Sequence, residues 1–185
     1  MSNTNNVKAA VMHEADQRLN NRKKVVLYGV TESSAANASD RIRHDKQELS
    51  KVLSIIGASE EIQEDGALRV TRVGKSDPTN PRPLRVELKS EIQRDELLDK
   101  ARILRDDDHS VRMKPDLTKM QRDQDKALRK EVDDLNKAKP SDGDGPFHWR
   151  VGGPPGQLRK TKVRGVAQPR RDRRGSQAQE EEEEA

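Results

Sequence analysis

The sequence predicts an α+β fold, in which a four-stranded antiparallel sheet with two helices is followed by a small helix-plus-hairpin domain. Two observations lead to this prediction. Strand-like and helix-like segments follow one another in the order β-α-β-β-α-β between residues 24 and 114. In addition, 30% of the 185 residues are apolar and 38% are charged, which is enough apolar material for one core of roughly 100 residues with polar flanking segments.

The first strand and the first helix are predicted from residues 24–57. Residues Lys24–Val30 are rich in side chains that favour strands and precede a polar loop at residues 31–38. This pattern predicts a buried strand. We expect Ser39 to cap the following helix and Gly57 to end it. The helix is indicated by apolar residues at helical spacing, namely Ile42, Leu49, Val52, Leu53 and Ile56.

Two further strands are predicted on either side of a loop rich in proline. Residues 68–73 and 84–88 alternate apolar side chains with charged ones, which is typical of a strand with one face in water. The loop between them contains Asp77-Pro78 and Asn80-Pro81, and both pairs break regular structure. Because the connection is short, the two strands are expected to pair with each other.

The second helix and the fourth strand complete the predicted sheet unit. Ser90 and Gln93 have the spacing of a capping box. The apolar stripe of this helix consists of Leu97, Leu98, Ala101 and Leu104. In segment 110–114, Val111 and Met113 alternate with Arg112 and Lys114, which predicts a strand. The resulting order is the split βαβ arrangement of ferredoxin-like and RRM-like domains, with both helices on one sheet face and the other face open.

The chain is predicted to have four segments. Residues 1–20 are a polar N-terminal segment and a candidate coiled-coil remnant, and residues 21–117 form the RRM-like domain. Residues 118–165 form the small C-terminal domain: a helix that starts at the capping-box pair Thr118 and Gln121, and a hairpin of residues 147–151 and 158–163. Residues 166–185 are rich in arginine and then in glutamate, which predicts a disordered charged tail.

Composition argues against an enzyme and points to a polyanion as the partner. The chain has no cysteine, its four histidines lack zinc-site spacing, and it has no glycine-rich phosphate loop or nucleophile motif. We therefore expect neither catalysis nor a cofactor or metal. No apolar run is long enough to span a membrane, so an intracellular protein is expected. Residues 66–89 contain six basic residues and only two acidic ones, and this excess of positive charge suggests a polyanion partner.

Several strings of the sequence, taken in order, resemble one protein family. The strings are Val25-Val26-Leu27-Tyr28-Gly29-Val30-Thr31-Glu32, Arg72-Val73-Gly74-Lys75, Arg82-Pro83-Leu84-Arg85-Val86, Leu97-Leu98-Asp99-Lys100-Ala101-Arg102, Val111-Arg112-Met113-Lys114-Pro115-Asp116-Leu117-Thr118, Gln121-Arg122 and Trp149-Arg150-Val151. Together they cover roughly residues 21–163. In these strings the chain resembles the nucleic-acid-binding C-terminal half of the first-open-reading-frame proteins of LINE-type retrotransposons.

The resemblance implies a function for the whole chain. It implies an RRM-like domain followed by a smaller C-terminal domain, binding of single-stranded RNA (with DNA as an alternative), and nucleic-acid chaperone activity in a ribonucleoprotein. It implies a cytoplasmic location, with the nucleus as an alternative. Proteins of this family carry an N-terminal coiled coil that forms homo-oligomers, and only the residues before Asn21 could belong to it here.

The residues themselves point to a cationic, sequence-tolerant interface. The chain has one Tyr, one Trp and one Phe, too few for base stacking on both central strands. Tyr28 is a candidate for stacking, whereas Trp149 is expected to pack with Phe147. Arginine suits phosphate oxygens, and we expect four strand arginines to project together from the open face. They are Arg69, Arg72, Arg85 and Arg112.

Further basic residues could extend this surface. Lys114 follows Arg112 on the wet side of the fourth strand, and Lys75 and Arg82 flank the loop between the second and third strands. The track could continue onto the C-terminal domain through Arg122, Arg150, Lys160 and Lys162. Three alternatives stay open: these are ordinary solubilising charges, the chain is an α+β protein-interaction module that binds no nucleic acid, or it is a degenerate element-derived chain with no retained activity.

Overall fold

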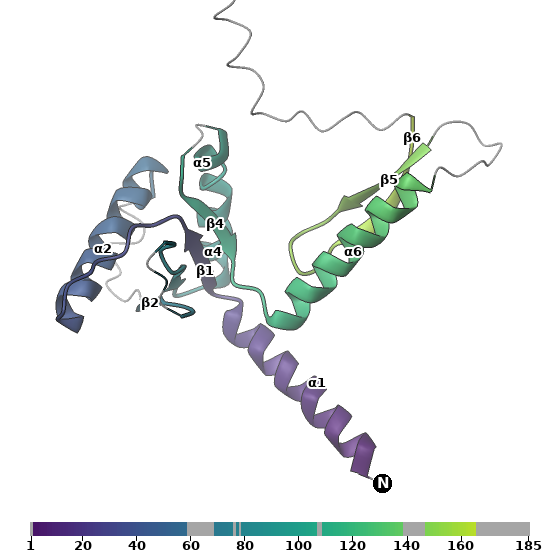
Figure 1. Cartoon of the computed structure of the whole chain (residues 1–185), viewed down its shortest axis with the longest axis horizontal. Coiled ribbons are helices and arrows are strands. Elements are labelled where there is room, and N and C mark those ends of the chain that lie inside the picture. Colours follow the sequence, from purple (N-terminus) through teal and green to yellow (C-terminus); the bar gives the residue numbers. More distant parts are fainter. Residues whose placement is uncertain are drawn as a thin grey trace, which may run out of the picture. The chain divides into compact units, whose positions relative to one another are not determined.

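The computed structural model describes residues 2–58, 69–75, 77, 79–106, 109–138 and 147–165. The chain divides into two compact units, residues 1–122 and 123–185, and Figure 1 shows their elements coloured along the sequence. The predicted α+β class is confirmed, because helices accompany a four-stranded antiparallel sheet and a two-stranded hairpin. Among the described residues, no helix is long and apolar enough to cross a membrane. The predicted tail, residues 166–185, lies outside the described part of the chain.

The sheet of the first unit has its four strands in the order β2-β3-β1-β4, and every neighbouring pair is antiparallel. The strands are β1 (Lys24–Tyr28), β2 (Arg69–Arg72), β3 (Leu84–Glu87) and β4 (Arg112–Pro115). Residues that face each other across an antiparallel pair point to the same side of the sheet. The register therefore assigns each strand residue to one of two faces.

One face of the sheet packs against helices and forms the core. The helices are α2 (Ala38–Ile55), α4 (Glu91–Lys100) and the short α5 (Ile103–Asp106). Val25, Leu27, Leu84 and Val86 are fully buried on this face. They cluster with side chains of the helices and of the loops that follow them, including Leu49, Val52, Leu53, Ile56, Leu97, Ala101 and Leu104. We call this side the helix face.

The start of α2 differs from the prediction. Asn37, and not Ser39, is the N-cap: the Asn37 side chain accepts hydrogen bonds from the Ser39 amide at 3.0 Å and from the Ser39 hydroxyl at 2.9 Å. The helix consequently includes Ser39 as an early residue. Ile42, predicted to lie in the core, is 50% exposed; the buried side of α2 begins at Asp45, and its buried apolar residues begin at Leu49.

The cap of α4 follows the prediction in part. The Ser90 hydroxyl accepts from the Gln93 amide at 3.1 Å, as in a capping box. The Gln93 side chain accepts instead from the Lys89 amide, also at 3.1 Å. The predicted second helix is divided: Leu97 belongs to α4 and Leu104 to α5, and both are buried.

The N-terminal segment is a helix, α1 (Ser2–Asn21), which leads directly into β1. Its Glu14 carboxylate accepts hydrogen bonds from the Thr118 hydroxyl at 2.6 Å and from Arg18 at 2.7 Å. These bonds, with the one from Thr118 the stronger, lower the pKa of Glu14. Glu14 thus ties α1 to the end of the sheet unit.

Helix α6 (Lys119–Lys137) begins at the predicted capping box. The Thr118 hydroxyl accepts from the Gln121 amide at 3.2 Å, and the Gln121 side chain accepts from the Thr118 amide at 3.1 Å. This pattern confirms the capping-box prediction.

The predicted hairpin is confirmed as β5 (Phe147–Gly152) paired with β6 (Arg159–Arg164). Asn136 of α6 holds β5 through both ends of its amide: it donates to the Trp149 carbonyl at 2.9 Å and accepts from the Trp149 amide at 2.7 Å. The Asn136 side chain thus supplies the hydrogen bonds that a neighbouring strand would otherwise make to the main chain of Trp149.

Candidate nucleic-acid interface

The register places several basic side chains on the sheet face opposite the helix face. Lys24 and Arg69 lie on either side of Glu87, and Arg85 and Lys114 lie on either side of Val26. Arg69 and Lys114 are exposed. We call this side the open face and define it by Lys24, Tyr28, Arg69, Arg85 and Lys114.

Lys24 is a member of this group that the sequence analysis did not name. It opens β1 and shares the period-two face of Val26 and Tyr28. Because alternate residues of a strand point to the same side, the sequence did contain the signal for Lys24. Of the predicted residues, the structure brings Arg69, Arg85 and Lys114 together on the open face with Tyr28.

Tyr28 is the aromatic residue of the group that defines the open face. It ends β1, its residue is 41% exposed, and the Lys114 ammonium lies 5.4 Å from the ring centroid. A cation at this distance over an aromatic face is attracted to it. Tyr28 thus lies outside the core, and base stacking on its ring stays a prediction.

Arg85 is held in place by a buried carboxylate. Its Nε lies 2.8 Å from Asp116 Oδ2, and its Nη2 lies 3.4 Å from Oδ1. The Asp116 side chain is only 2% exposed while that of Arg85 is 35% exposed. Asp116 therefore fixes the orientation of Arg85, whose side chain stays partly exposed.

The prediction that Arg72 projects from the open face is wrong. Arg72 faces Leu84 in the register, so it lies on the helix face, and its side chain is 6% exposed. Its guanidinium donates to the Asp45 carboxylate of α2 at 2.7 and 3.0 Å. It also donates to the carbonyls of Val30 and Arg82, at 2.9 and 2.6 Å. Arg72 is therefore a structural residue of the core edge.

Arg82 is also committed to a partner within the chain. Its side chain forms an ion pair with Glu32, and its amide donates to the same carboxylate at 3.1 Å. The hydrogen bonds from the Arg82 side chain lower the pKa of Glu32, against the opposing effect of burial. The pair joins the loop after β1 to the loop before β3, so Arg82 lies off the strands that form the open face.

The remaining predicted residues of the first unit do not add a projecting cation to the open-face group. Arg112 lies on the open face, opposite Tyr28 in the register, but its guanidinium turns back and donates to the main-chain oxygens of Leu104 and His109, contrary to the expectation that it projects with the others. Lys75 is exposed in the turn after β2. Arg122 is exposed at the start of α6 and donates to the Leu117 carbonyl at 2.7 Å.

The three basic residues predicted in the hairpin lie on two different sides of it. Lys160 and Lys162 face Val151 and Trp149 in the register, whereas Arg150 faces Thr161 on the other side. The expectation of one continuous basic track through all three is therefore wrong within the hairpin. The sequence analysis also missed Arg159, which is exposed on the side of Arg150.

Trp149 packs as predicted against Phe147. Their ring centroids are 6.3 Å apart at an interplanar angle of 84°, an edge-to-face geometry that aromatic pairs prefer. The Lys162 ammonium lies 3.7 Å from the Phe147 ring centroid, and that of Lys160 lies 5.7 Å from the Trp149 centroid. Lys160 also forms an ion pair with Glu131 of α6. We call this side of the hairpin the lysine face.

Comparison with known proteins assigns no family to this chain. No protein-family model matches it, and no curated protein does so either.

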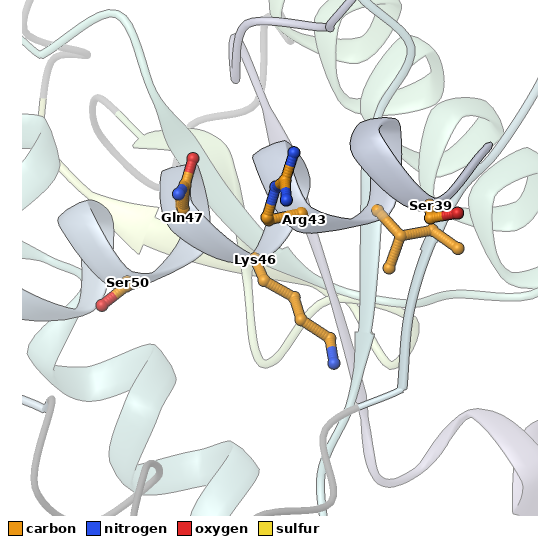
Figure 2. Close-up of a pocket in the computed structure, with 6 residues that line it drawn as sticks. Ser39, Arg43, Lys46, Gln47 and Ser50 are labelled. Carbon is orange, nitrogen blue, oxygen red and sulfur yellow. The ribbon is translucent and has the colours of Figure 1, made fainter. Parts of the chain in front are cut away.

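A hollow with a volume of about 460 Å³ lies on the exposed side of α2. Figure 2 shows its lining side chains rising from successive turns of one helix. They are Ser39, Ile42, Arg43, Lys46, Gln47 and Ser50. Arg43 is already paired with Asp40 at 2.6 Å. The buried stripe of α2 packs on the helix face, so this hollow is separate from the open face.

Proposed function

We propose that the chain binds single-stranded RNA, with little sequence preference, through the open face of its sheet. The observation that carries the proposal is the register, which places Lys24, Arg69, Arg85 and Lys114 on the same sheet face as the exposed Tyr28. Cations of this kind neutralise phosphates and release counterions. One aromatic ring adds stacking to any base, because every base has a π-face.

We further propose that the sheet unit is a ferredoxin-like domain of the RRM-like type. The succession of β1, α2, β2, β3, α4 and β4, together with the sheet order β2-β3-β1-β4, supports this assignment. RRM-like domains bind RNA on the sheet face that carries no helices. The open face occupies that position here. The assignment also agrees with the resemblance to LINE-type first-open-reading-frame proteins and with a chaperone role in a ribonucleoprotein.

The composition of the open face supports weak sequence discrimination. Base reading in RRM-like domains uses aromatic residues on both central strands. Here the central strand β3 has the sequence Leu-Arg-Val-Glu, so it offers Arg85 in place of an aromatic ring. Guanidinium groups bind phosphate and also stack on bases of any type. Affinity is therefore expected to come from the RNA backbone and to depend strongly on salt.

A homo-oligomeric contact through α1 is a second proposal, and a specific observation favours it. The exposed apolar residues Val7, Val11 and Leu19 follow one another at multiples of four, which places them on one side of a helix. Met12 beside them is 69% exposed. Light scattering on the full chain tests the proposal: a mass above 20.9 kDa that returns to this value in Val11→Glu supports it, and a monomeric parent contradicts it.

The RNA-binding proposal is tested by titrating a fluorescent single-stranded RNA with the full chain over a series of salt concentrations. Four phosphate contacts on a single strand predict a slope of log K against log salt of about −3. RNAs of unrelated sequence should bind with similar affinity, and an RNA duplex should bind more weakly. Absence of binding at low salt would contradict the proposal and favour the alternative, a protein-interaction module.

A further inference from the structure

The side of the hairpin opposite the lysine face carries two arginines. Arg150 faces Thr161, and Arg159 faces Gly152, in neighbouring positions of the register. Arg150 and Arg159 are thus diagonal neighbours, which lie about 7–8 Å apart in such an arrangement. Both are exposed. We call this side the arginine face; neither strand of the hairpin contains an acidic residue.

The chain leaves the hairpin beside the arginine face. His148 belongs to this face, since it faces Val163 in the register. Its Nδ1 lies 3.1 Å from the Gly165 carbonyl oxygen, and because a carbonyl only accepts, Nδ1 is the donor. Gly165 has a φ of 108°, which favours glycine and turns the chain at this point. Gly165 therefore lies next to the arginine face.

The sequence after Gly165 supplies an anionic segment of suitable reach. Residues 166–179 connect Gly165 to five consecutive glutamates, Glu180–Glu184. Random-coil statistics for a connector of this length give a root-mean-square span of about 20 Å. A six-residue strand such as β6 measures about 20 Å, so the glutamates can reach any position along the arginine face.

We propose that Glu180–Glu184 docks on the arginine face, and that it thereby keeps Arg150 and Arg159 from adding RNA phosphate contacts to those of the open face. The competition rests on the proposed RNA-binding function, whereas the docking does not. Strand arginines are held by the hairpin, so pairing with them costs less conformational freedom than pairing with arginines of the connector itself. Short connectors give high effective concentrations, which lets individually weak exposed ion pairs act together.

The docking is tested without RNA on the full chain by recording amide NMR spectra at low salt. The test variant changes all five glutamates to glutamine, and the matched control changes them to aspartate and so keeps the charge. Docking predicts that the amides of Arg150, Arg159 and Thr161 shift in the glutamine variant and stay near the parent positions in the aspartate variant. Unchanged positions in the glutamine variant would overturn the proposal.

The competition is tested by titrating fluorescent single-stranded RNA. At low salt, the glutamine variant should bind about threefold more tightly than the parent, because exposed ion pairs are weak. The gain should vanish at high salt, and it should be absent when Arg150→Gln and Arg159→Gln are also present. A gain that persists with those two changes would overturn the proposal, since the glutamates would then act on Arg170–Arg174. If no variant binds RNA, the proposed function fails while the NMR result still decides the docking.

Discussion

Arg72→Met should strongly destabilise the sheet unit, because Arg72 supports the core edge and lies away from the open face. The Arg72 and Asp45 side chains are 6% and 10% exposed. The substitution leaves the Asp45 carboxylate without its cation and removes donors from the carbonyls of Val30, Thr31 and Arg82. Breaking a buried ion pair by removing one partner costs about 3–5 kcal/mol. That is a large part of the usual stability of a domain, about 5–15 kcal/mol.

Amide hydrogen exchange of β1 in the full chain measures this loss, since β1 lies at the centre of the sheet and reports its unfolding. Arg69→Met is the matched control: it removes the same charge from an exposed position of the same strand, and its effect should stay within about 0.5 kcal/mol. The double change Arg72→Met with Asp45→Leu should recover part of the loss. A loss below about 1 kcal/mol in Arg72→Met would refute the structural role assigned to this arginine.

Three further predictions concern residues near the end of β1. Gly29→Ala should destabilise the unit by about 2 kcal/mol or more in denaturant unfolding, because Gly29 has a φ of 80° and an added Cβ would meet the Ser110 carbonyl; a neutral effect would contradict this. The Glu32–Arg82 pair should stabilise the fold fully above the usual carboxyl pKa of 4.5 and lose its effect as the pH falls through the lowered value. Glu32→Gln should therefore flatten the acid part of a stability–pH profile, and a parallel profile would count against the pair. Tyr28→Leu should weaken RNA binding by about 1 kcal/mol while Tyr28→Phe retains it; equal losses would indicate that the hydroxyl, and not the ring, makes the contact.

The sequence predicted the elements well where local chemistry determines them. The capping box at Thr118 and Gln121 and the alternation in the hairpin required only spacing and residue type. The α+β class followed from the succession of periodic segments. The start of α2 was less certain, because Asn37 and Ser39 are both good caps, and only the hydrogen bonds distinguish them.

The candidate site was predicted less well, since it depends on which side of a strand each residue takes. Arg69 and Arg72 are three positions apart, so regular alternation puts them on opposite faces, and the sequence analysis did not apply this rule. The partner of Arg72 is Asp45 of α2, a long-range contact that no local pattern reveals. Arg150 and Lys160 belong to different strands, and their relative sides follow from the length of the turn between β5 and β6.

The hydrogen-bond partners of Arg82 and Arg112 within the chain could not be predicted either. Arg82 pairs with Glu32, which lies 50 residues earlier in the chain, and Arg112 turns back to main-chain oxygens near α5. Arginine readily bonds carbonyls and carboxylates in this way. Basic residues in a strand pattern therefore indicate a candidate surface, and the tertiary contacts decide which of them remain available.

The salt dependence of RNA binding by an open-face variant tests the central claim most directly. The variant carries Lys24→Gln, Arg69→Gln and Lys114→Gln and leaves the Arg85–Asp116 pair intact. A control with the same net charge carries Arg43→Gln, Lys46→Gln and Lys51→Gln on α2, away from the open face. We expect the slope to fall from about −3 to about −1 in the open-face variant and to stay near −3 in the control. Equal slopes in the two variants would show that RNA is not held on the open face.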